Sequence, residues 1–152
     1  MADTFQVACL CGDVRFKLVP PSLFCAYCHC DYCRAAFVTW VGASEERFEL
    51  DDPNGRLIWH PSSKQSRRGF CGQCGSTLFF ASDLAPGEIH VARALIRGEI
   101  DRLPEANAFH DQRVHWVEIS GDLANYDSDG PELNHYRDIK TMDSGTSRLI
   151  QQ

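Results

Sequence analysis

Hydrophobic and polar residues alternate at 4–19 and at 45–50, which is the pattern of strands that bury one face, and 35–41 is an apolar run rich in residues that favour strands. The segment 4–19 alternates on both sides of a Cys-Leu-Cys-Gly-Asp turn and predicts a β-hairpin with a cysteine knuckle. The segment 88–96 fits either a strand or a short helix. The pattern as a whole predicts a mainly β fold with a mostly antiparallel sheet. Further strands are expected at 23–28, 35–41, 45–50, 56–60, 76–81 and 114–120.

The chain of 152 residues is 43% hydrophobic, which is enough for one domain with a buried core. Residues 1–126 carry the strand pattern and are expected to form this β domain. Residues 127–152 are acidic and polar, and we expect them to be a mobile tail or to dock on a partner subunit of a homo-oligomer.

The formal net charge of −6 and the pI near 5.4 argue against a nucleic-acid-binding protein, because such proteins present clustered basic residues. No run of about 18 apolar residues suggests a membrane span, and the first residues do not resemble a signal peptide. A cytoplasmic protein with no nucleic-acid or membrane partner is therefore expected.

Eight cysteines fall into three tight groups that are separated by long intervals. Without a secretion signal, such groups are more typical of metal sites than of disulfide bonds. A two-residue spacing is also too short for an unstrained disulfide to contribute much. The groups are Cys9-x-Cys11, Cys25-x2-Cys28-x-Cys30-x2-Cys33 and Cys71-x2-Cys74.

The first and last groups can close a metal site by themselves. Cys9 and Cys11 lie two apart on a strand and therefore share one face, and Cys71-x2-Cys74 is a rubredoxin-like thiolate turn. We expect these cysteines to form a four-thiolate zinc site. Its role is structural, because it ties the N-terminal hairpin to the middle of the chain.

The central group then leaves three ligands, Cys28, Cys30 and Cys33, for a second zinc ion. In an extended strand Cys25 faces away from Cys28, which favours a buried core thiol over a fourth ligand. Closure of this site by Cys25 or by a distant histidine is the alternative. An open zinc with three thiolates suits the binding of a substrate thiol, which would then add to a carbonyl group.

Three motifs, CLCGDV at 9–14, CHCDYCR at 28–34 and RGFCGQCGS at 68–76, resemble the glutathione-dependent formaldehyde-activating enzyme family, also called the centromere protein V-like family. The resemblance implies a β-tent fold of the Mss4-like type, with two zinc ions per chain. The four-cysteine set would hold the structural ion, and the central three cysteines the catalytic one. The implied activity is the addition of glutathione to formaldehyde to give S-hydroxymethylglutathione, formally a carbon–sulfur lyase run in reverse.

The resemblance also implies residues that bind the substrate. Glutathione carries two carboxylates, and Arg34 and Arg68 are expected to bind them because they lie beside the cysteine motifs and match family positions. His60, His90 and His115 are open alternatives for proton transfer, since spacing selects none of them. The alternative function is a non-catalytic zinc-binding interaction module.

Overall fold

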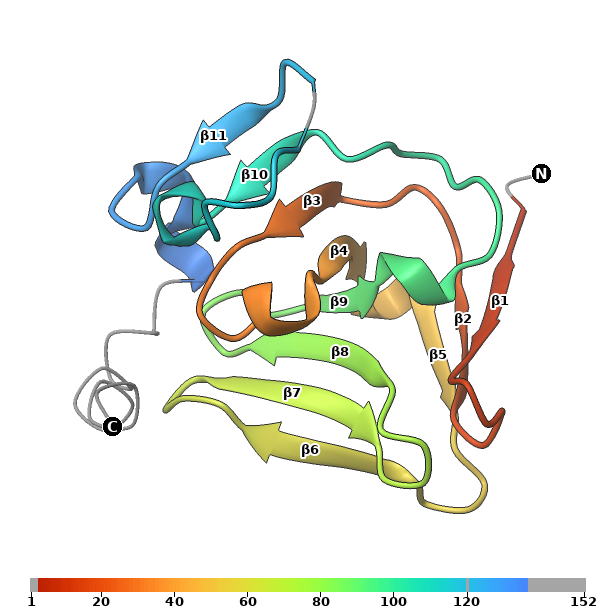
Figure 1. Ribbon diagram of the computed structural model, residues 1–152. Helices are drawn as coiled ribbons and strands as arrows, with labels where there is room; N and C mark the ends of the chain where they lie inside the picture. The colour runs from red at the N-terminus through yellow and green to blue at the C-terminus, as the bar shows by residue number, and fades with distance from the viewer. Residues whose placement is uncertain (1–2, 120, 137–152) are drawn as a thin grey trace.

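The computed structural model describes residues 3–119 and 121–136 (Figure 1). These residues fold into strands joined by loops and short 3-10 turns, which confirms the predicted mainly β class. None of the helical turns in the described ranges is long or apolar enough to cross a membrane. The strands are β1 (Phe5–Ala8), β2 (Arg15–Leu18), β3 (Phe24–Cys28), β4 (Thr39–Ser44), β5 (Phe48–Asp51), β6 (Leu57–Pro61), β7 (Ser66–Cys71), β8 (Thr77–Ser82), β9 (Glu88–Ala92), β10 (Ala106–Ala108) and β11 (Ala124–Tyr126). The 3-10 turns are η1 (Arg34–Ala36), η2 (Glu45–Arg47), η3 (Arg93–Leu95), η4 (His110–Gln112) and η5 (Pro131–Tyr136).

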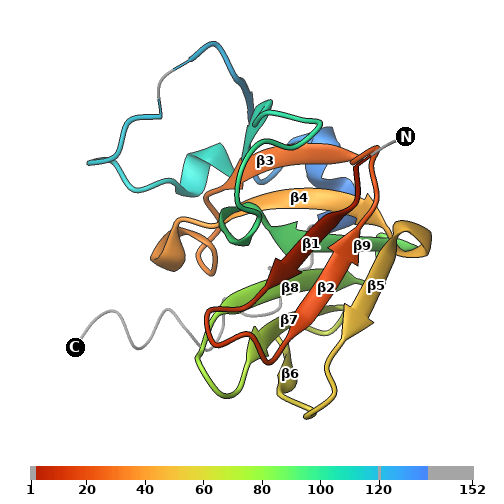
Figure 2. The ribbon, with the colours of Figure 1, turned by 90° about the vertical axis from the view of Figure 1, so that its right-hand side faces the viewer.

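The strands form two sheets that pack against each other (Figure 2). The smaller sheet has three antiparallel strands in the order β1-β2-β5, and its first pair is the predicted N-terminal hairpin. The larger sheet has eight strands in the order β11-β10-β3-β4-β9-β8-β7-β6. Its pairs are antiparallel except those of β10, which runs parallel to both β3 and β11. The larger sheet is therefore mostly antiparallel, as predicted.

Successive side chains of the larger sheet point to opposite faces and enter two separate hydrophobic clusters. In β8, Phe79 belongs to the cluster beneath the smaller sheet, whereas Phe80 belongs to the cluster on the other face. In β4, Val41 and Trp40 divide in the same way. The first cluster is the structural core, where Phe16 of the smaller sheet packs edge-on against Phe79 with ring centroids 5.1 Å apart. The second cluster lines a cavity.

The predicted strand at 35–41 is wrong in its first half. The 3-10 turn η1 occupies that half, and β4 starts only at Thr39. The chain turns here because Val38 donates its backbone N–H to Cys33 O at 3.2 Å, which folds the loop back after the cysteine motif. The apolar run therefore predicted β4 correctly, but it predicted the start of this strand too early.

The C-terminal half of the domain differs more from the sequence pattern. The strand predicted at 114–120 is wrong for its described residues 114–119, where Trp116 is 70% exposed and no ladder forms. The sheet edge beside β3 is occupied by β10 instead. The ambiguous segment 88–96 contains both predicted forms, since β9 is followed directly by η3.

The described part of the predicted tail, residues 127–136, packs on its own chain. The turn η5 buries Leu133 to 4% exposure within the second hydrophobic cluster, and Tyr136 packs beside it. This differs from the predicted mobile or partner-docked segment, because these two side chains supply apolar surface that the same chain buries. The rest of that predicted segment, 137–152, lies outside the described residues.

Candidate functional site

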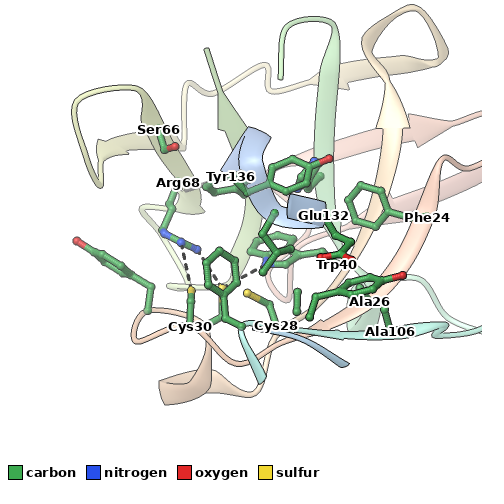
Figure 3. A pocket seen from close by; sticks show the side chains of 18 of the residues that line it. Phe24, Ala26, Cys28, Cys30, Trp40, Ser66, Arg68, Ala106, Glu132 and Tyr136 are labelled. Carbon is green, nitrogen blue, oxygen red and sulfur yellow. Dashed lines mark hydrogen bonds between the residues drawn. The ribbon is translucent and has the colours of Figure 1, made fainter. Parts of the chain in front are cut away.

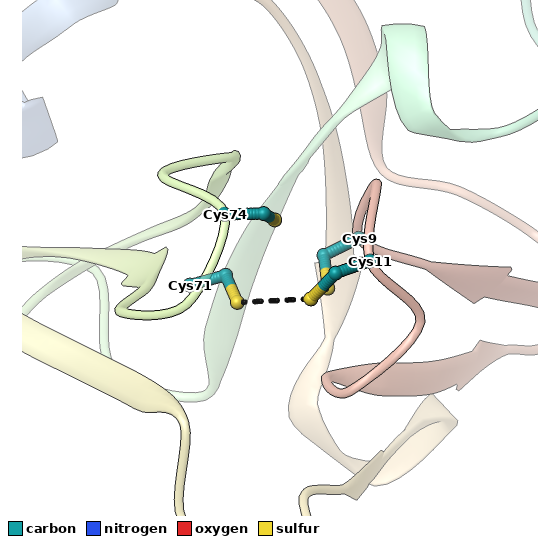
Figure 4. A group of neighbouring side chains, drawn as sticks. All are labelled: Cys9, Cys11, Cys71 and Cys74. Carbon is teal, nitrogen blue, oxygen red and sulfur yellow. Dashed lines mark hydrogen bonds between the residues drawn. The ribbon is translucent and has the colours of Figure 1, made fainter.

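Four cysteine sulfurs meet between the turns of the smaller sheet and the larger one (Figure 4). Cys9 and Cys11 follow β1, whereas Cys71 ends β7 and Cys74 lies in the turn before β8. Their sulfurs all lie within 4.8 Å of one another; Cys9 Sγ is 3.5 Å from Cys11 Sγ, which is 3.7 Å from Cys71 Sγ. A tetrahedral zinc site with bonds of about 2.3 Å separates its sulfurs by about 3.8 Å. The donor set and its spacing therefore fit one metal ion.

Tight backbone turns aim these sulfurs at one another. Gly12 has φ +83° in the first turn, and Gly75 has φ +76° in the second, where its N–H donates to Cys71 O at 2.7 Å. Both conformations favour glycine. The hydroxyl of Ser76 lies 3.1 Å from Cys74 Sγ, and this hydrogen bond lowers the pKa of the Cys74 thiol to about 5. The turn therefore favours the thiolate form that a metal binds.

A second group of three sulfurs lies on the opposite face of the larger sheet. Cys28 ends β3, and the loop that follows returns Cys30 and Cys33 to the same place. Arg34 donates its backbone N–H to Cys30 O at 2.9 Å, which helps to fix that loop. Cys30 and Cys33 are each 1% exposed, and Cys28 is partly buried. The structure thus brings together the three cysteines that the sequence grouped.

Cys25 does not belong to either group of sulfurs. It is fully buried in the structural core beneath the smaller sheet, and it is not bridged to another cysteine. Its neighbours on β3, Phe24 and Ala26, face the cavity together with Cys28. The prediction from strand alternation is therefore confirmed, and Cys25 does not close the three-sulfur group.

Arg68 of β7 reaches over the three-sulfur group (Figure 3). Its Nη1 donates to Cys33 Sγ at 3.2 Å, and its Nη2 lies 3.9 Å from Cys30 Sγ. The guanidinium also lies 4.6 Å from the ring centroid of Tyr32 and 5.0 Å from that of Phe80. These contacts make Arg68 a counter-ion of the sulfurs that is held by two aromatic rings.

The same contacts favour a thiolate at Cys33. The thiols of Cys28 and Cys30 hydrogen-bond to Cys33 Sγ and, with the charge of Arg68, hold the pKa of the Cys33 thiol well below its usual range. Trp40 adds a hydrogen bond from its Nε1–H to the same sulfur at 3.3 Å. The group is therefore prepared to bind a cation or to share protons among its sulfurs.

Arg34 lies beside the cysteine loop but does not line the cavity. It forms an ion pair with Asp31 at 2.8 Å and donates to Gln112 O at 2.9 Å. These contacts connect the loop to η4. The binding of substrate carboxylates by Arg34 and Arg68 stays a prediction.

The three-sulfur group forms part of the wall of a cavity of about 360 Å³ (Figure 3). Figure 3 shows Arg68 on one side of this cavity and Phe24 on the other. Aromatic rings make up most of the wall between them, and the pocket opens toward solvent. The aromatic lining residues are Phe24, Tyr32, Trp40, Phe80, Phe109, Tyr126 and Tyr136.

His90 of β9 is held in the wall of this cavity by a small hydrogen-bond network. Its Nε2 lies 3.1 Å from Glu88 Oε2, and Tyr136 donates its hydroxyl to the same oxygen at 3.0 Å. The rings of Phe24 and Phe80 pack on the imidazole with centroids 4.8 and 5.2 Å away. Burial lowers the pKa of His90, so the ring is neutral at neutral pH. Nε2–H then donates to the carboxylate, and Nδ1 carries the lone pair.

The other two histidines considered for proton transfer are outside this cavity. His60 lies on β6 and His115 in the loop after η4, and both are exposed. Only His90 of the three shares the cavity with the three-sulfur group.

A comparison with known protein families gives a match over the segment that carries the cysteines. The model of the glutathione-dependent formaldehyde-activating enzymes, abbreviated GFA, matches residues 4–117, well over half of the chain. The chain belongs to the GFA family. The predicted family resemblance is therefore confirmed, and the match includes all eight cysteines.

Two relatives of this GFA chain carry names that suggest enzymes. A Halomonas elongata protein, provisionally named as a glutathione-dependent formaldehyde-activating enzyme, is 26% identical over 127 residues, which are 74% of this chain and 78% of the relative. An uncharacterised lyase of Schizosaccharomyces pombe is 32% identical over 83 residues, or 51% of this chain and 57% of the relative. These names support an enzyme.

A solved structure supports the fold. The crystal structure of a Rhodobacter sphaeroides protein superposes with a TM-score of 0.52 at 20% identity and covers 63% of this chain and 91% of that one. At this identity the likeness concerns the fold alone. The finer assignment to a β-tent of the Mss4-like type stays a prediction.

The family match ends at residue 117, but the cavity wall continues beyond it. Tyr126 of β11 and Glu132, Leu133 and Tyr136 of η5 complete that wall. The sequence pattern did not predict their place in the cavity wall, because isolated side chains in a polar segment carry no periodic signal. It also missed Glu88, since nothing in sequence separates a buried acid that holds a histidine from a solvated one.

Proposed function

We propose that this GFA protein is a zinc-dependent enzyme of the carbon–sulfur lyase type, which adds a thiol to a small aldehyde such as formaldehyde or reverses that addition. The observation that supports the proposal is the position of Cys28, Cys30 and Cys33 in the wall of a cavity of about 360 Å³. A structural metal site needs no cavity, whereas a site that exchanges a ligand with substrate does. The same observation favours an enzyme over a non-catalytic interaction module.

Zinc is the metal that we infer for both groups of sulfurs, because donor sets made of thiolates alone favour zinc. The four-cysteine group would hold a structural ion. The three-cysteine group would hold an ion with one position left for substrate. Bound there, zinc would lower the pKa of an incoming thiol and so supply a thiolate nucleophile at neutral pH.

The proposed reaction forms one carbon–sulfur bond and needs no oxidant or reductant. The sulfur of the thiol donates an electron pair to the carbonyl carbon, and the carbon–oxygen double bond becomes a single bond. The proton of the thiol ends on that oxygen, so the product is an S-hydroxymethyl adduct and no group leaves. A residue in the cavity that carries this proton from the sulfur to the oxygen would speed the addition.

His90 is the residue that we assign to this proton transfer. Its neutral ring offers Nδ1 as an acceptor, while the hydrogen bond to Glu88 fixes the tautomer and stabilises the protonated ring when it forms. Tyr136 holds the Glu88 oxygen in place. Arg68 has a different role, since it compensates the negative charge of the sulfurs.

The experiment compares metal content and formaldehyde consumption in the wild type and two cysteine variants. Cys30→Ser should contain one zinc ion per chain in place of two, and its consumption of formaldehyde with thiol should fall to the uncatalysed rate. Cys25→Ala is the matched control, because Cys25 is buried outside both groups, and it should keep both ions and the wild-type rate. A wild-type rate in Cys30→Ser would contradict the proposal.

A further inference from the structure

The walls of the cavity are mostly aromatic and apolar, and the polar side chains among them include Ser62, Ser63 and Ser66. Arg68 is the only lysine or arginine among the described lining residues, and its Nη atoms already lie 3.2 and 3.9 Å from Cys33 and Cys30. The lining also contains two carboxylates, Glu105 and Glu132. The described wall therefore carries more negative than positive charge, apart from the sulfurs themselves.

Glutathione is a poor match for such a wall. It has two carboxylates and one ammonium group, and a carboxylate that leaves water needs a cation or several hydrogen-bond donors to compensate it. Glu105 is engaged with Arg102 at 3.1 Å, so that arginine is occupied as well. The carboxylates of glutathione would lie near the exposed Glu105 and Glu132, which carry charge of the same sign.

The size of the cavity points to a larger apolar group. A volume of about 360 Å³ exceeds what formaldehyde needs and lies at the lower end of cavities that enclose organic ligands of several rings or branches. Aromatic rings line it, and such rings bind apolar and aromatic groups through burial and edge or face contacts. Since the sulfur of the substrate belongs at the three-cysteine group, the rest of that thiol must occupy this volume.

Part of the cavity wall comes from residues that the family match does not include. Tyr126, Leu133 and Tyr136 come from β11 and η5, beyond residue 117. Leu133 is only 4% exposed, so this segment packs firmly against the rest of the cavity wall. The cysteines within the family match would then provide the chemistry, and the later segment would select the substrate.

We propose that this cavity selects an uncharged thiol with an aromatic or branched apolar group, and that Tyr126, Leu133 and Tyr136 form the surface that recognises that group. The inference rests on the proposed function, because the sulfur of this thiol is the atom placed at the three-cysteine group. It changes the expected substrate class from a charged peptide thiol to an apolar one.

The test is calorimetric titration of the zinc-loaded full-length protein with three thiols. We expect 2-phenylethanethiol to bind at least tenfold more tightly than either glutathione or 2-mercaptoethanol. A second calorimetric titration uses 2-phenylethanol and the zinc-loaded Cys30→Ser protein, which keeps the structural ion. This alcohol lacks the sulfur, so its binding reports recognition of the apolar group by the cavity wall alone; we expect it to bind, and no detectable binding would contradict the proposal.

A charge reversal tests the electrostatic part of the argument. Glu132→Lys should raise the affinity for glutathione at least fivefold and leave that for 2-phenylethanethiol within twofold. Glu46→Lys is the control, because Glu46 is exposed on η2 and does not line the cavity; it should change neither affinity.

The outcomes separate this inference from the proposed function. If glutathione binds as tightly as 2-phenylethanethiol or more tightly, the substrate class is overturned and the proposed function stands. If none of the three thiols binds the zinc-loaded protein, the proposed function is overturned, and the inference falls with it.

Discussion

Replacing Cys71 by serine tests whether the four-cysteine group is the structural metal site. Cys71 ends β7 and lies 3.7 Å from Cys11 of the smaller sheet, so a metal held there connects the two sheets. Cys30→Ser is the matched comparison, because it removes one sulfur from the other group. Both cysteines are almost fully buried, at 0% and 1% exposure, so the cost of burying a hydroxyl is similar in the two variants and cancels in the comparison.

The difference in stability follows from the length of chain that each metal would close. Cys11 and Cys71 are 60 residues apart, and a cross-link over such a loop contributes about 4 kcal/mol in the chain-entropy treatment. Cys28 and Cys33 are five residues apart, which corresponds to about 2 kcal/mol. Cys71→Ser should therefore lower the free energy of unfolding by about 2 kcal/mol more than Cys30→Ser, or roughly 4–8 °C more in Tm for a chain of this size.

The assay is thermal unfolding followed by circular dichroism, with the zinc content of each sample measured alongside. Each variant should retain one zinc ion per chain in place of two, and only Cys71→Ser should show the larger loss of Tm. Equal losses of Tm in the two variants would refute the reasoning, because the cross-link between the sheets would then contribute nothing beyond the local loop.

Three further predictions concern the cavity and its wall. His90→Gln should lower kcat by about 10²- to 10⁴-fold and leave KM within a few-fold, because glutamine still fills the cavity wall but cannot take the proton. Steady-state kinetics will measure both constants, and an unchanged kcat would exclude proton transfer by His90. Burial depresses the pKa of His90 in the folded state, so below about pH 6.5 the unfolded chain binds more protons than the folded chain does. The free energy of unfolding should therefore decrease as the pH falls through this value. Urea titrations between pH 5 and 8 should show this decrease in the wild type and a smaller one in His90→Gln. Leu133→Ala should lower the free energy of unfolding by about 2–4 kcal/mol, because Leu133 is buried. A urea titration will measure this loss, and a loss below about 1 kcal/mol would mean that η5 does not stabilise the domain.

Sequence reasoning predicted those parts of the site that depend on local spacing. Cys28 and Cys30 are two apart, and strand alternation separates both from Cys25, so the division of the cysteines needed no knowledge of tertiary structure. The partners of His90 could not be predicted in this way. Glu88 is two residues away on the same strand, but Tyr136 is 48 residues further along than Glu88, and only the packing of η5 against the larger sheet brings it there.

The fold shows the same division between local and long-range information. The N-terminal hairpin follows from alternation within one segment, and the structure contains it at the predicted place. The parallel strand β10 has only three residues, and its pairing with β3 depends on a chain that returns from about 80 residues away. No local pattern predicts such a short strand. The exposed segment near Trp116, in contrast, has a strand-like sequence but forms no strand.

The orientation of β3 has a consequence for how this centre could change over evolutionary time. Cys25 lies one position before Ala26, whose side chain faces the cavity, and three positions before Cys28. Deletion of Ala26 would shift Cys25 by one residue relative to Cys28 and turn its thiol from the core into the cavity wall. The deletion of a single codon would therefore convert a centre with three sulfurs into one with a fourth sulfur in the same cavity.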